Sequence, residues 1–195
     1  MLSRIGTALV IIVTALFGVA FGADDVPAGK RTVSGKYLSA KDAYERVMAN
    51  KGSTLFLDVR TSSEVVYVGM ADAVDAVVPF VEFKQPLTWD DKGGRFETIP
   101  NARFVQFVDA ALKSKGLNKS DPVVVMCRSG ERSAKAVNVL AQNGYTEVWS
   151  VHDGFEGDLS NDGRRSVNGW KNASLPWSYK LDKSKLQWVL DAGAN

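Results

Sequence analysis

The sequence predicts an α/β protein with a mainly parallel central sheet and helices on both of its faces. Short apolar runs that suit strands buried on both sides alternate along the chain with segments of helical period. Parallel strands require crossover connections, and the helices in those connections cover the two faces of the sheet. The 195 residues, of which 45% are apolar, suffice for one domain with a complete core.

The first half of the chain gives one helix and two strands. Residues 39–42 (Ser-Ala-Lys-Asp) resemble a capping box with aspartate in the third position, so a helix is expected over residues 40–50. Residues 54–59 form a short apolar run and are predicted to be a buried strand. Residues 65–81 alternate small and apolar side chains, which indicates a further strand that ends near Pro79.

The second half continues the alternation of helices and strands. An amphipathic helix is expected over residues 101–115, where apolar side chains recur at spacings of three and four. Residues 123–126 (Val-Val-Val-Met) are predicted to be the central strand, and the next helix and strand are expected over residues 133–143 and 147–151. A short helix or tail is predicted over residues 182–195.

Cys127 is the only cysteine, and it stands where the predicted central strand meets the next helix. In parallel sheets, sites gather at the carboxyl ends of the strands. The N–H groups at a helix start favour an anion, and Arg128 and Arg132 add positive charge, so the position favours a thiolate. Glu131 opposes this effect unless it turns outward. The alternative is a small buried hydrophobic residue, which is the usual fate of a free cysteine.

Three stretches together resemble the rhodanese family of sulfurtransferases. Residues 127–133 (Cys-Arg-Ser-Gly-Glu-Arg-Ser) resemble the active-site loop of that family. Residues 57–64 (Leu-Asp-Val-Arg-Thr-Ser-Ser-Glu) are similar to its first signature, and residues 148–157 resemble its closing signature. The three stretches follow the order of the family, and the resemblance covers roughly residues 36–177.

The resemblance implies a rhodanese-like domain over residues 36–181, in which Cys127 is the catalytic residue and carries a persulfide between turnovers. It implies that Asp58 and Arg60 brace neighbouring loops through an ion pair and take no part in the chemistry. It also implies that the loop after the cysteine binds the substrate, through Arg128, Ser129, Gly130, Glu131, Arg132 and Ser133.

The chain departs from the family pattern in several places. Gly69-Met70-Ala71 stands where the family usually has Gly-His-Ile, and the segments 82–103 and 158–179 exceed a minimal domain. His152, the only histidine, is interpreted as a polar loop residue, because a thiolate that is already ionised needs no base. The aromatic residues near the C-terminus are expected to pack over the domain: Trp170, Trp177 and Tyr179.

The N-terminus has the pattern of a secretory signal. Arg4 precedes an uncharged stretch over residues 5–23, which contains small residues near its end. We therefore expect a signal peptide over residues 1–22, a flexible leader over residues 23–35 and export to the periplasm. The alternative is an uncleaved membrane anchor, since about 18 apolar residues can span a bilayer.

The predicted function is a thiosulfate sulfurtransferase of the single-domain rhodanese type. It moves sulfane sulfur from thiosulfate or a similar anionic donor to cyanide, a thiol or a protein acceptor through a Cys127 persulfide. No cofactor is expected, and one cysteine and one histidine at unrelated positions make no metal site. The formal charge of +2 without a basic run argues against nucleic acid as a partner.

Two other function classes remain open. Cysteine-dependent phosphatases and arsenate reductases also hold a thiolate in an anion cradle, but their loops place five residues between the cysteine and the arginine. Here four residues separate Cys127 from Arg132. The other class is a persulfide carrier or binding module that serves one partner protein.

Overall fold

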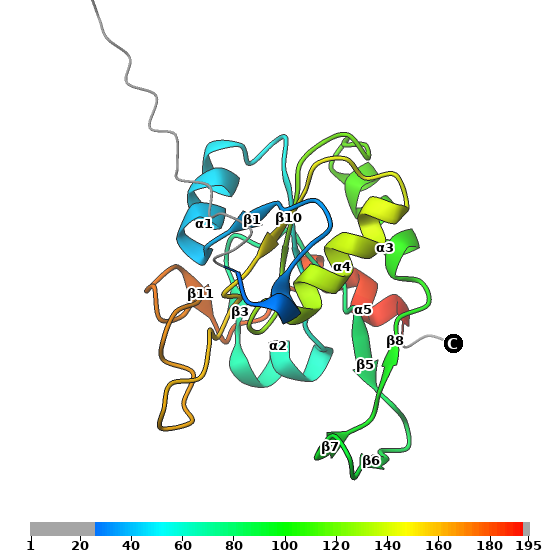
Figure 1. Cartoon of the computed structure of the whole chain (residues 1–195). Coiled ribbons are helices and arrows are strands. Elements are labelled where there is room, and N and C mark those ends of the chain that lie inside the picture. Colours follow the sequence, from blue (N-terminus) through cyan, green and yellow to red (C-terminus); the bar gives the residue numbers. More distant parts are fainter. Residues whose placement is uncertain (1–25, 193–195) are drawn as a thin grey trace, which may run out of the picture.

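Five parallel strands form the centre of the molecule (Figure 1). The structure is a computed structural model that describes residues 26–192. The strand order is β1-β10-β9-β2-β4, and every neighbouring pair is parallel. The strands are β1 (Tyr37–Leu38), β10 (Val148–Val151), β9 (Val123–Met126), β2 (Leu55–Asp58) and β4 (Ala76–Val77). The predicted fold class, α/β with a mainly parallel sheet, is confirmed.

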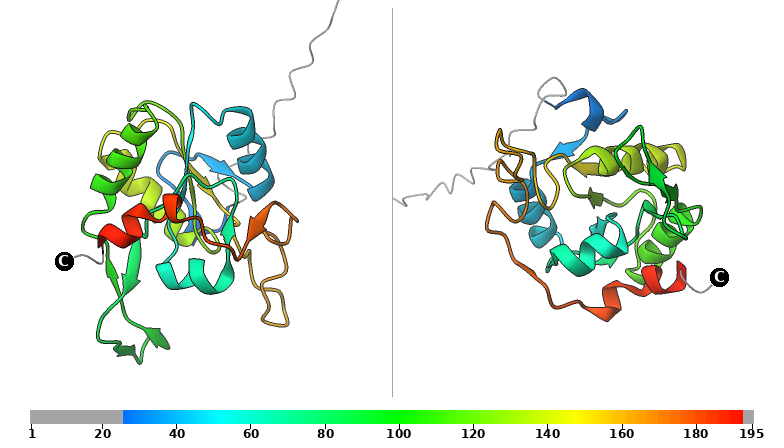
Figure 2. Two further views of the ribbon diagram at one scale, coloured as in Figure 1. Left: turned by 180° about the vertical axis from the view of Figure 1, so that it is seen from behind. Right: turned by 90° about the horizontal axis from the view of Figure 1, so that it is seen from below.

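Helices cover both faces of the sheet, as Figures 1 and 2 show. The central strand β9 alternates its side chains between them. Val123, Val125 and Cys127 lie in one apolar cluster with the third and fourth helices. Val124 and Met126 lie in the opposite cluster with the first two helices. The helices are α1 (Ala40–Ala49), α2 (Ser62–Val68), α3 (Phe104–Ser114) and α4 (Glu131–Gln142). The alternation fixes which way the cysteine at the strand end points.

The capping box predicted before α1 is confirmed. The Ser39 hydroxyl accepts a hydrogen bond from the Asp42 N–H at 3.1 Å, and the Asp42 carboxylate accepts one from the Ser39 N–H at 3.4 Å. These contacts pair backbone groups that have no partner inside the helix.

The strand predicted over residues 65–81 is wrong for its first part. The chain there forms α2, the short strand β3 (Met70–Ala71) and then β4. A second capping box starts α2: the Thr61 hydroxyl accepts from the Glu64 N–H at 3.2 Å, and the Glu64 carboxylate accepts from the Thr61 N–H at 2.9 Å. This cap outweighs the strand preference of the valines that follow it.

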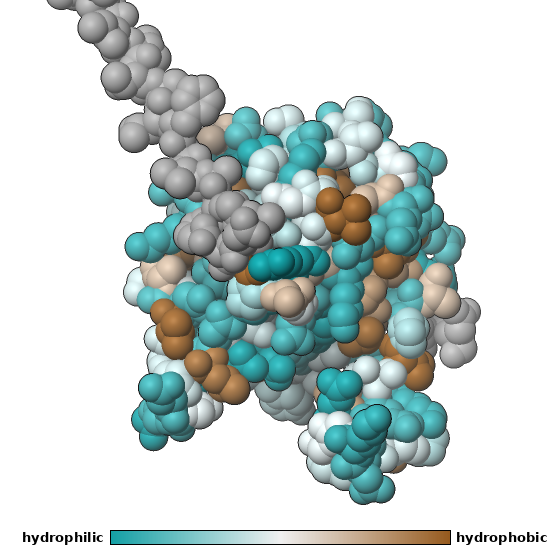
Figure 3. Space-filling view, viewed as in Figure 1, coloured by the Kyte–Doolittle hydropathy of each residue, from teal (hydrophilic) through white to brown (hydrophobic). Residues whose placement is uncertain are grey.

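The extra segment after β4 builds an arm, which we define as residues 81–100. The strands β5 (Val81–Phe83) and β8 (Thr98–Pro100) pair at its base, and β6 (Trp89–Asp90) and β7 (Arg95–Phe96) pair at its tip. Both pairs are antiparallel. The arm projects from the body at the lower right of Figures 1 and 3. It lies at the lower left in the left view of Figure 2, where the molecule is seen from behind.

The second extra segment wraps around the body. Trp170 is fully buried; its ring packs edge-on against Tyr44 and at a tilt against Phe56. The strand β11 (Trp177–Ser178) pairs with β3. The aromatic residues therefore pack over the domain as predicted, although Tyr179 is largely exposed. The chain then forms η3 (Lys183–Lys185) and α5 (Gln187–Ala192), which is the short C-terminal helix that was expected.

The signal peptide predicted over residues 1–22, and residues 23–25 and 193–195, lie outside the described residues. The flexible leader predicted up to residue 35 is wrong for residues 26–35, which pack against the body. Val26 is buried, the short helix η2 (Ala28–Lys30) follows it, and Lys30 forms an ion pair with Asp158 at 2.5 Å. Within residues 26–192, no helix has the length and apolar character needed to cross a bilayer.

Candidate active site

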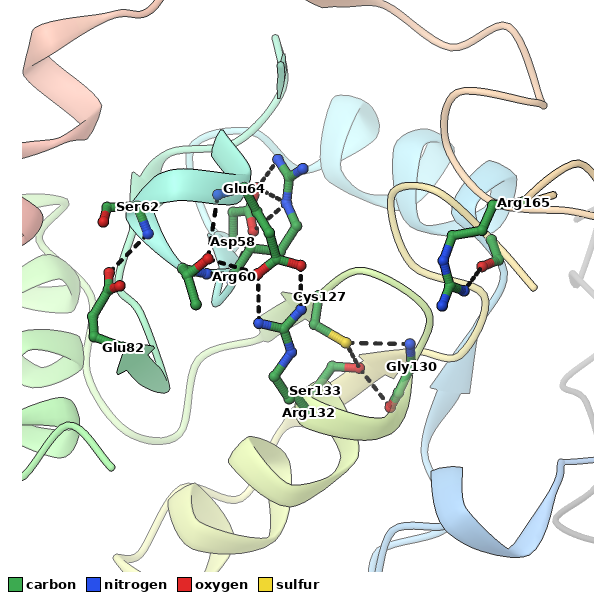
Figure 4. A network of polar contacts seen from close by, with 12 residues as sticks. Asp58, Arg60, Ser62, Glu64, Glu82, Cys127, Gly130, Arg132, Ser133 and Arg165 are labelled. Carbon is green, nitrogen blue, oxygen red and sulfur yellow. Dashed lines mark hydrogen bonds and ion pairs between the residues drawn. The ribbon is translucent and has the colours of Figure 1, made fainter. Parts of the chain in front are cut away.

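Cys127 lies at the carboxyl end of β9, where the chain turns into α4. Only 1% of the residue is exposed. Its Sγ accepts a hydrogen bond from the Gly130 N–H at 3.2 Å and lies 3.6 Å from Ser133 Oγ (Figure 4). The residue belongs to an apolar cluster, yet it also lines a cavity. The sulfur therefore has apolar neighbours on one side and a backbone hydrogen-bond donor on the other.

Hydrogen bonds from the loop after β10 orient the cysteine loop. The Phe155 N–H donates to the Cys127 carbonyl at 2.8 Å, and the Glu156 N–H donates to the Arg128 carbonyl at 2.9 Å. In a trans peptide the carbonyl and the following N–H point in opposite directions. Both carbonyls are thus turned toward the β10 loop, and the next two N–H groups of the cysteine loop are turned away from it.

Two glycines allow this close approach. Gly130 has a φ of +102°, and a Cβ there would lie 2.0 Å from the His152 carbonyl oxygen. Gly154 has a φ of +66°, and a Cβ there would lie 2.6 Å from the backbone of Cys127 and Arg128. His152 thus contributes its backbone to the site, and its N–H donates to the Leu38 carbonyl at 3.0 Å.

We expect Gly130→Ala to lower the free energy of unfolding by about 1–3 kcal/mol more than Gly116→Ala does, because the added Cβ overpacks the contact with His152. Gly116 also has a positive φ, of +71°, but a Cβ there meets nothing within 4 Å. Both variants strain the backbone, and only the first also forces two loops apart. Urea denaturation measures the difference. Equal losses in the two variants would contradict a tight contact at Gly130.

Arg132 forms a two-pronged ion pair with Glu64 of α2. The Arg132 Nη1 and Nη2 atoms lie 2.6 and 2.5 Å from the two carboxylate oxygens (Figure 4). Arg132 was predicted to bind the donor. It lines the cavity described below, and both of its terminal nitrogens bind the Glu64 carboxylate. Glu64 was overlooked as a site residue, although it stands at the end of the first signature stretch.

The pair is ionised over a wide pH range. Burial disfavours the charged form of Glu64, but the hydrogen bonds and charge of Arg132, with two hydrogen bonds from Thr61, outweigh it and lower its pKa to about 2. Burial likewise opposes the charge of Arg132, yet Glu64, with smaller effects of Cys127 and Asp58, raises the pKa of the guanidinium. An ionised pair with little net charge therefore lies beside the cysteine loop.

The depressed pKa of Glu64 predicts a pH-dependent stability. Because its pKa falls from 4.5 to about 2 on folding, the stabilisation is complete above pH 4.5 and is lost as the pH falls toward 2. We expect Glu64→Gln to remove roughly 2–3 kcal/mol at pH 7, and this gap from the wild type to narrow below pH 4.5. Urea denaturation at several pH values measures it. The exposed Glu45→Gln is the matched control, and a gap that does not change with pH would contradict the assignment.

Asp58 and Arg60 form a fully buried ion pair beside the site (Figure 4). The Arg60 Nη2 atom lies 2.6 Å from Asp58 Oδ2 and 2.8 Å from the Gly69 carbonyl oxygen. The guanidinium also lies over the ring of Phe155, 3.9 Å from its centroid. The pair thus connects β2, the end of α2 and the loop that orients the cysteine. Neither Asp58 nor Arg60 lines the cavity beside the cysteine.

A cavity of about 360 Å³ lies next to Cys127. Three parts of the chain line it: the start of α2, the arm with the residue before it, and the cysteine loop with α4 as far as Lys135. The residues are Thr61, Glu64, Phe80, Val81, Phe83, Arg95, Phe96, Thr98, Cys127, Arg128, Ser129, Glu131, Arg132 and Lys135.

The structure brings most of the predicted site residues to this cavity. Gly130 and Ser133 are buried and do not line the cavity, but both contact the Cys127 sulfur as described above. Arg128 and Glu131 are exposed, and both line the cavity. The sequence interpretation missed Lys135, which lies one helical turn after Glu131 and on the same side of α4. It also missed the arm residues, for which the local pattern gave no signal. Within residues 26–192, no group of three potential ligands gathers to hold a metal ion.

Comparisons with known proteins find a matching family model, relatives of similar sequence and a solved structure of similar fold. Residues 39–160 match the family model described as a rhodanese-like domain. An uncharacterized protein of Rickettsia prowazekii is 30% identical over 144 residues, which are 73% of this chain and 96% of that protein. The adenylyltransferase and sulfurtransferase MOCS3 of Oryza sativa subsp. japonica is 29% identical over 61% of this chain and 23% of its own length. The crystal structure of Rv0390 from M. tuberculosis is 29% identical, covers 74% of this chain and 97% of its own, and gives a TM-score of 0.56.

Proposed function

Because the chain belongs to the rhodanese-like family, we propose that it is a sulfurtransferase in which Cys127 carries sulfane sulfur from an anionic donor to a thiophilic acceptor. Family membership supports sulfur transfer in general. The observation that carries the specific proposal is the position of Cys127 Sγ, which lines a cavity and accepts a hydrogen bond from the Gly130 N–H.

The proposed reaction has two steps at one sulfur atom. The Cys127 thiolate attacks the outer sulfur of thiosulfate, the S–S bond of the donor breaks, and sulfite leaves with the bonding electrons. The amide groups of the loop then stabilise the anionic outer sulfur of the persulfide. In the second step an external nucleophile, either cyanide or a thiol, takes that sulfur and the Cys127 thiolate is restored.

The charges around the cavity suit an anionic donor. Arg128 and Lys135 line it from the cysteine loop and α4, and both are exposed. Such cations raise the local concentration of an anion and its rate of association. The Arg132–Glu64 pair adds little net charge, so we assign donor binding mainly to Arg128, as expected from the sequence, and to Lys135.

The structure offers an argument against a phosphatase or arsenate reductase. Such enzymes hold a tetrahedral oxyanion with the arginine that ends the loop, and bidentate contacts are the strong ones for such groups. In this chain both terminal nitrogens of Arg132 already bind Glu64. The persulfide carrier that serves a partner protein remains the second candidate.

Intact mass spectrometry tests the proposal directly. We expect incubation with thiosulfate or inorganic polysulfide to add about 32 Da, one sulfur atom, to the protein, and cyanide to remove it. Hydrolysis of a phosphate monoester, measured on the same sample, is expected to be absent. No adduct with either donor, together with phosphatase activity, would overturn the assignment.

A further inference from the structure

The cavity beside Cys127 is larger than an inorganic sulfur donor requires. At about 30 Å³ per water molecule, its volume of about 360 Å³ holds roughly a dozen waters, whereas thiosulfate has only a few non-hydrogen atoms. The size lies in the range of pockets that bind small organic molecules.

The arm side of this cavity is apolar and held in place. Phe80, Phe83 and Phe96 line it. Phe80 packs edge-on against Phe104 of α3, and Phe96 packs edge-on against both Phe83 and Trp89. Phe96 nevertheless keeps 45% of its surface exposed. A ring that is fixed by neighbours and left half uncovered is suited to pack against an apolar ligand.

The charge at the cavity is mainly positive. Arg95 comes from the arm, and Arg128 and Lys135 come from the opposite side, while Glu131 is the one lining carboxylate outside the Glu64–Arg132 pair. The nearest ion-pair contact of Arg95 is with Asp90 at 3.9 Å, and its side chain is 75% exposed. Such an exposed pair contributes less than about 1 kcal/mol, so Arg95 can turn to a ligand at little cost.

The arm is also tied to the cysteine loop. The Glu82 carboxylate of β5 accepts a hydrogen bond from the Ser62 N–H at 2.7 Å, at the start of α2 (Figure 4). Glu64, two residues further along α2, binds Arg132. Lys84 and Glu97 pair across the base of the arm at 2.8 Å. The arm wall is therefore positioned before any ligand arrives, which lowers the entropy lost on binding.

From these contacts we infer that the arm forms an acceptor subsite for organic thiols that have an apolar body of several carbons and a terminal carboxylate. The inference rests on the proposed function, because it names the acceptor of the second step. The acceptor thiolate attacks the outer sulfur of the Cys127 persulfide. A new S–S bond forms, the bond to Cys127 Sγ breaks, and its electron pair returns to Sγ. The product is an organic persulfide, and no oxidant or reductant is consumed.

Transfer kinetics on the full chain test the subsite. We expect kcat/KM for 6-mercaptohexanoate to exceed that for 3-mercaptopropionate at least threefold, and to exceed that for 6-mercaptohexanol at least tenfold. In Arg95→Gln, the ratio of kcat/KM for 6-mercaptohexanoate to that for cyanide should fall about tenfold. The control Lys92→Gln removes a charge on the same arm outside the cavity, and its ratio should stay within twofold of the wild type. Equal rates with the acid and the alcohol, or equal effects of the two variants, would overturn the inference.

A binding measurement separates this inference from the proposed function. The thioether 6-(methylthio)hexanoate cannot accept sulfur, and its dissociation constant is measured by NMR titration. We expect Arg95→Gln and Phe96→Ala to weaken binding at least fivefold, and Lys92→Gln and Leu87→Ala to leave it within twofold. If 6-(methylthio)hexanoate binds but Cys127 takes up no sulfur, the proposed function is contradicted and the subsite is supported. If the protein transfers sulfur to cyanide but does not bind 6-(methylthio)hexanoate, the subsite is contradicted and the proposed function is supported.

Discussion

We expect Cys127→Ser to abolish sulfur transfer, with a loss on the order of a thousandfold or more, because the proposed chemistry passes through this one atom. A serine hydroxyl is far less acidic than a thiol and cannot hold a persulfide. The variant should keep its fold. The hydroxyl is slightly smaller than the thiol, and the Gly130 N–H and Ser133 Oγ remain beside it as hydrogen-bond partners.

Three measurements on this variant decide the point. The thiosulfate:cyanide assay gives the activity, intact mass gives the sulfur adduct, and urea denaturation gives the free energy of unfolding. The expected combination is no activity, no adduct and a stability within about 1 kcal/mol of the wild type. Because Cys127 is the only cysteine, an adduct that persists in the variant would mean that the sulfur is carried by some other group.

The largest loss of stability is expected for Asp58→Ala. Removing one partner of a buried ion pair costs about 3–5 kcal/mol, because the other charge is left without compensation in the interior. Both side chains are fully buried here. Without the Asp58 carboxylate, the Arg60 guanidinium would keep only the Gly69 carbonyl and the Phe155 ring as partners of its side chain. Such a loss is a large part of the 5–15 kcal/mol that stabilises a typical domain.

A double-mutant cycle with Arg60→Ala measures this coupling by urea denaturation. The matched control is Glu147→Ala, which breaks a partly exposed pair with Lys36 and should cost less than about 1 kcal/mol. We expect the double variant Asp58→Ala, Arg60→Ala to lose less than the sum of the two single variants. If Asp58→Ala were no more harmful than the control, the pair would not be the brace that its geometry indicates.

Local patterns in the sequence were enough to predict the central strands and the start of the first helix. The apolar runs over residues 54–59 and 123–126 predicted two central strands, because a strand buried on both faces needs uninterrupted apolar side chains. The Ser39–Asp42 box predicted the start of α1 for an equally local reason. Over residues 61–68 two local signals compete: the alternation after Thr61 predicts a strand, whereas the Thr61–Glu64 cap starts a helix, and the cap prevails.

The sequence by itself therefore determined the α/β sheet, its family and the strand end on which Cys127 stands. Only the tertiary structure decided the partner of Arg132, because Glu64 lies 68 residues away in the sequence. Only the tertiary structure decided the approach of Gly154 to the cysteine loop. It also decided that the arm would supply one wall of the cavity. Helix caps and strand periods arise among neighbours in the chain, whereas these contacts arise only when packing brings distant segments to one edge of the sheet.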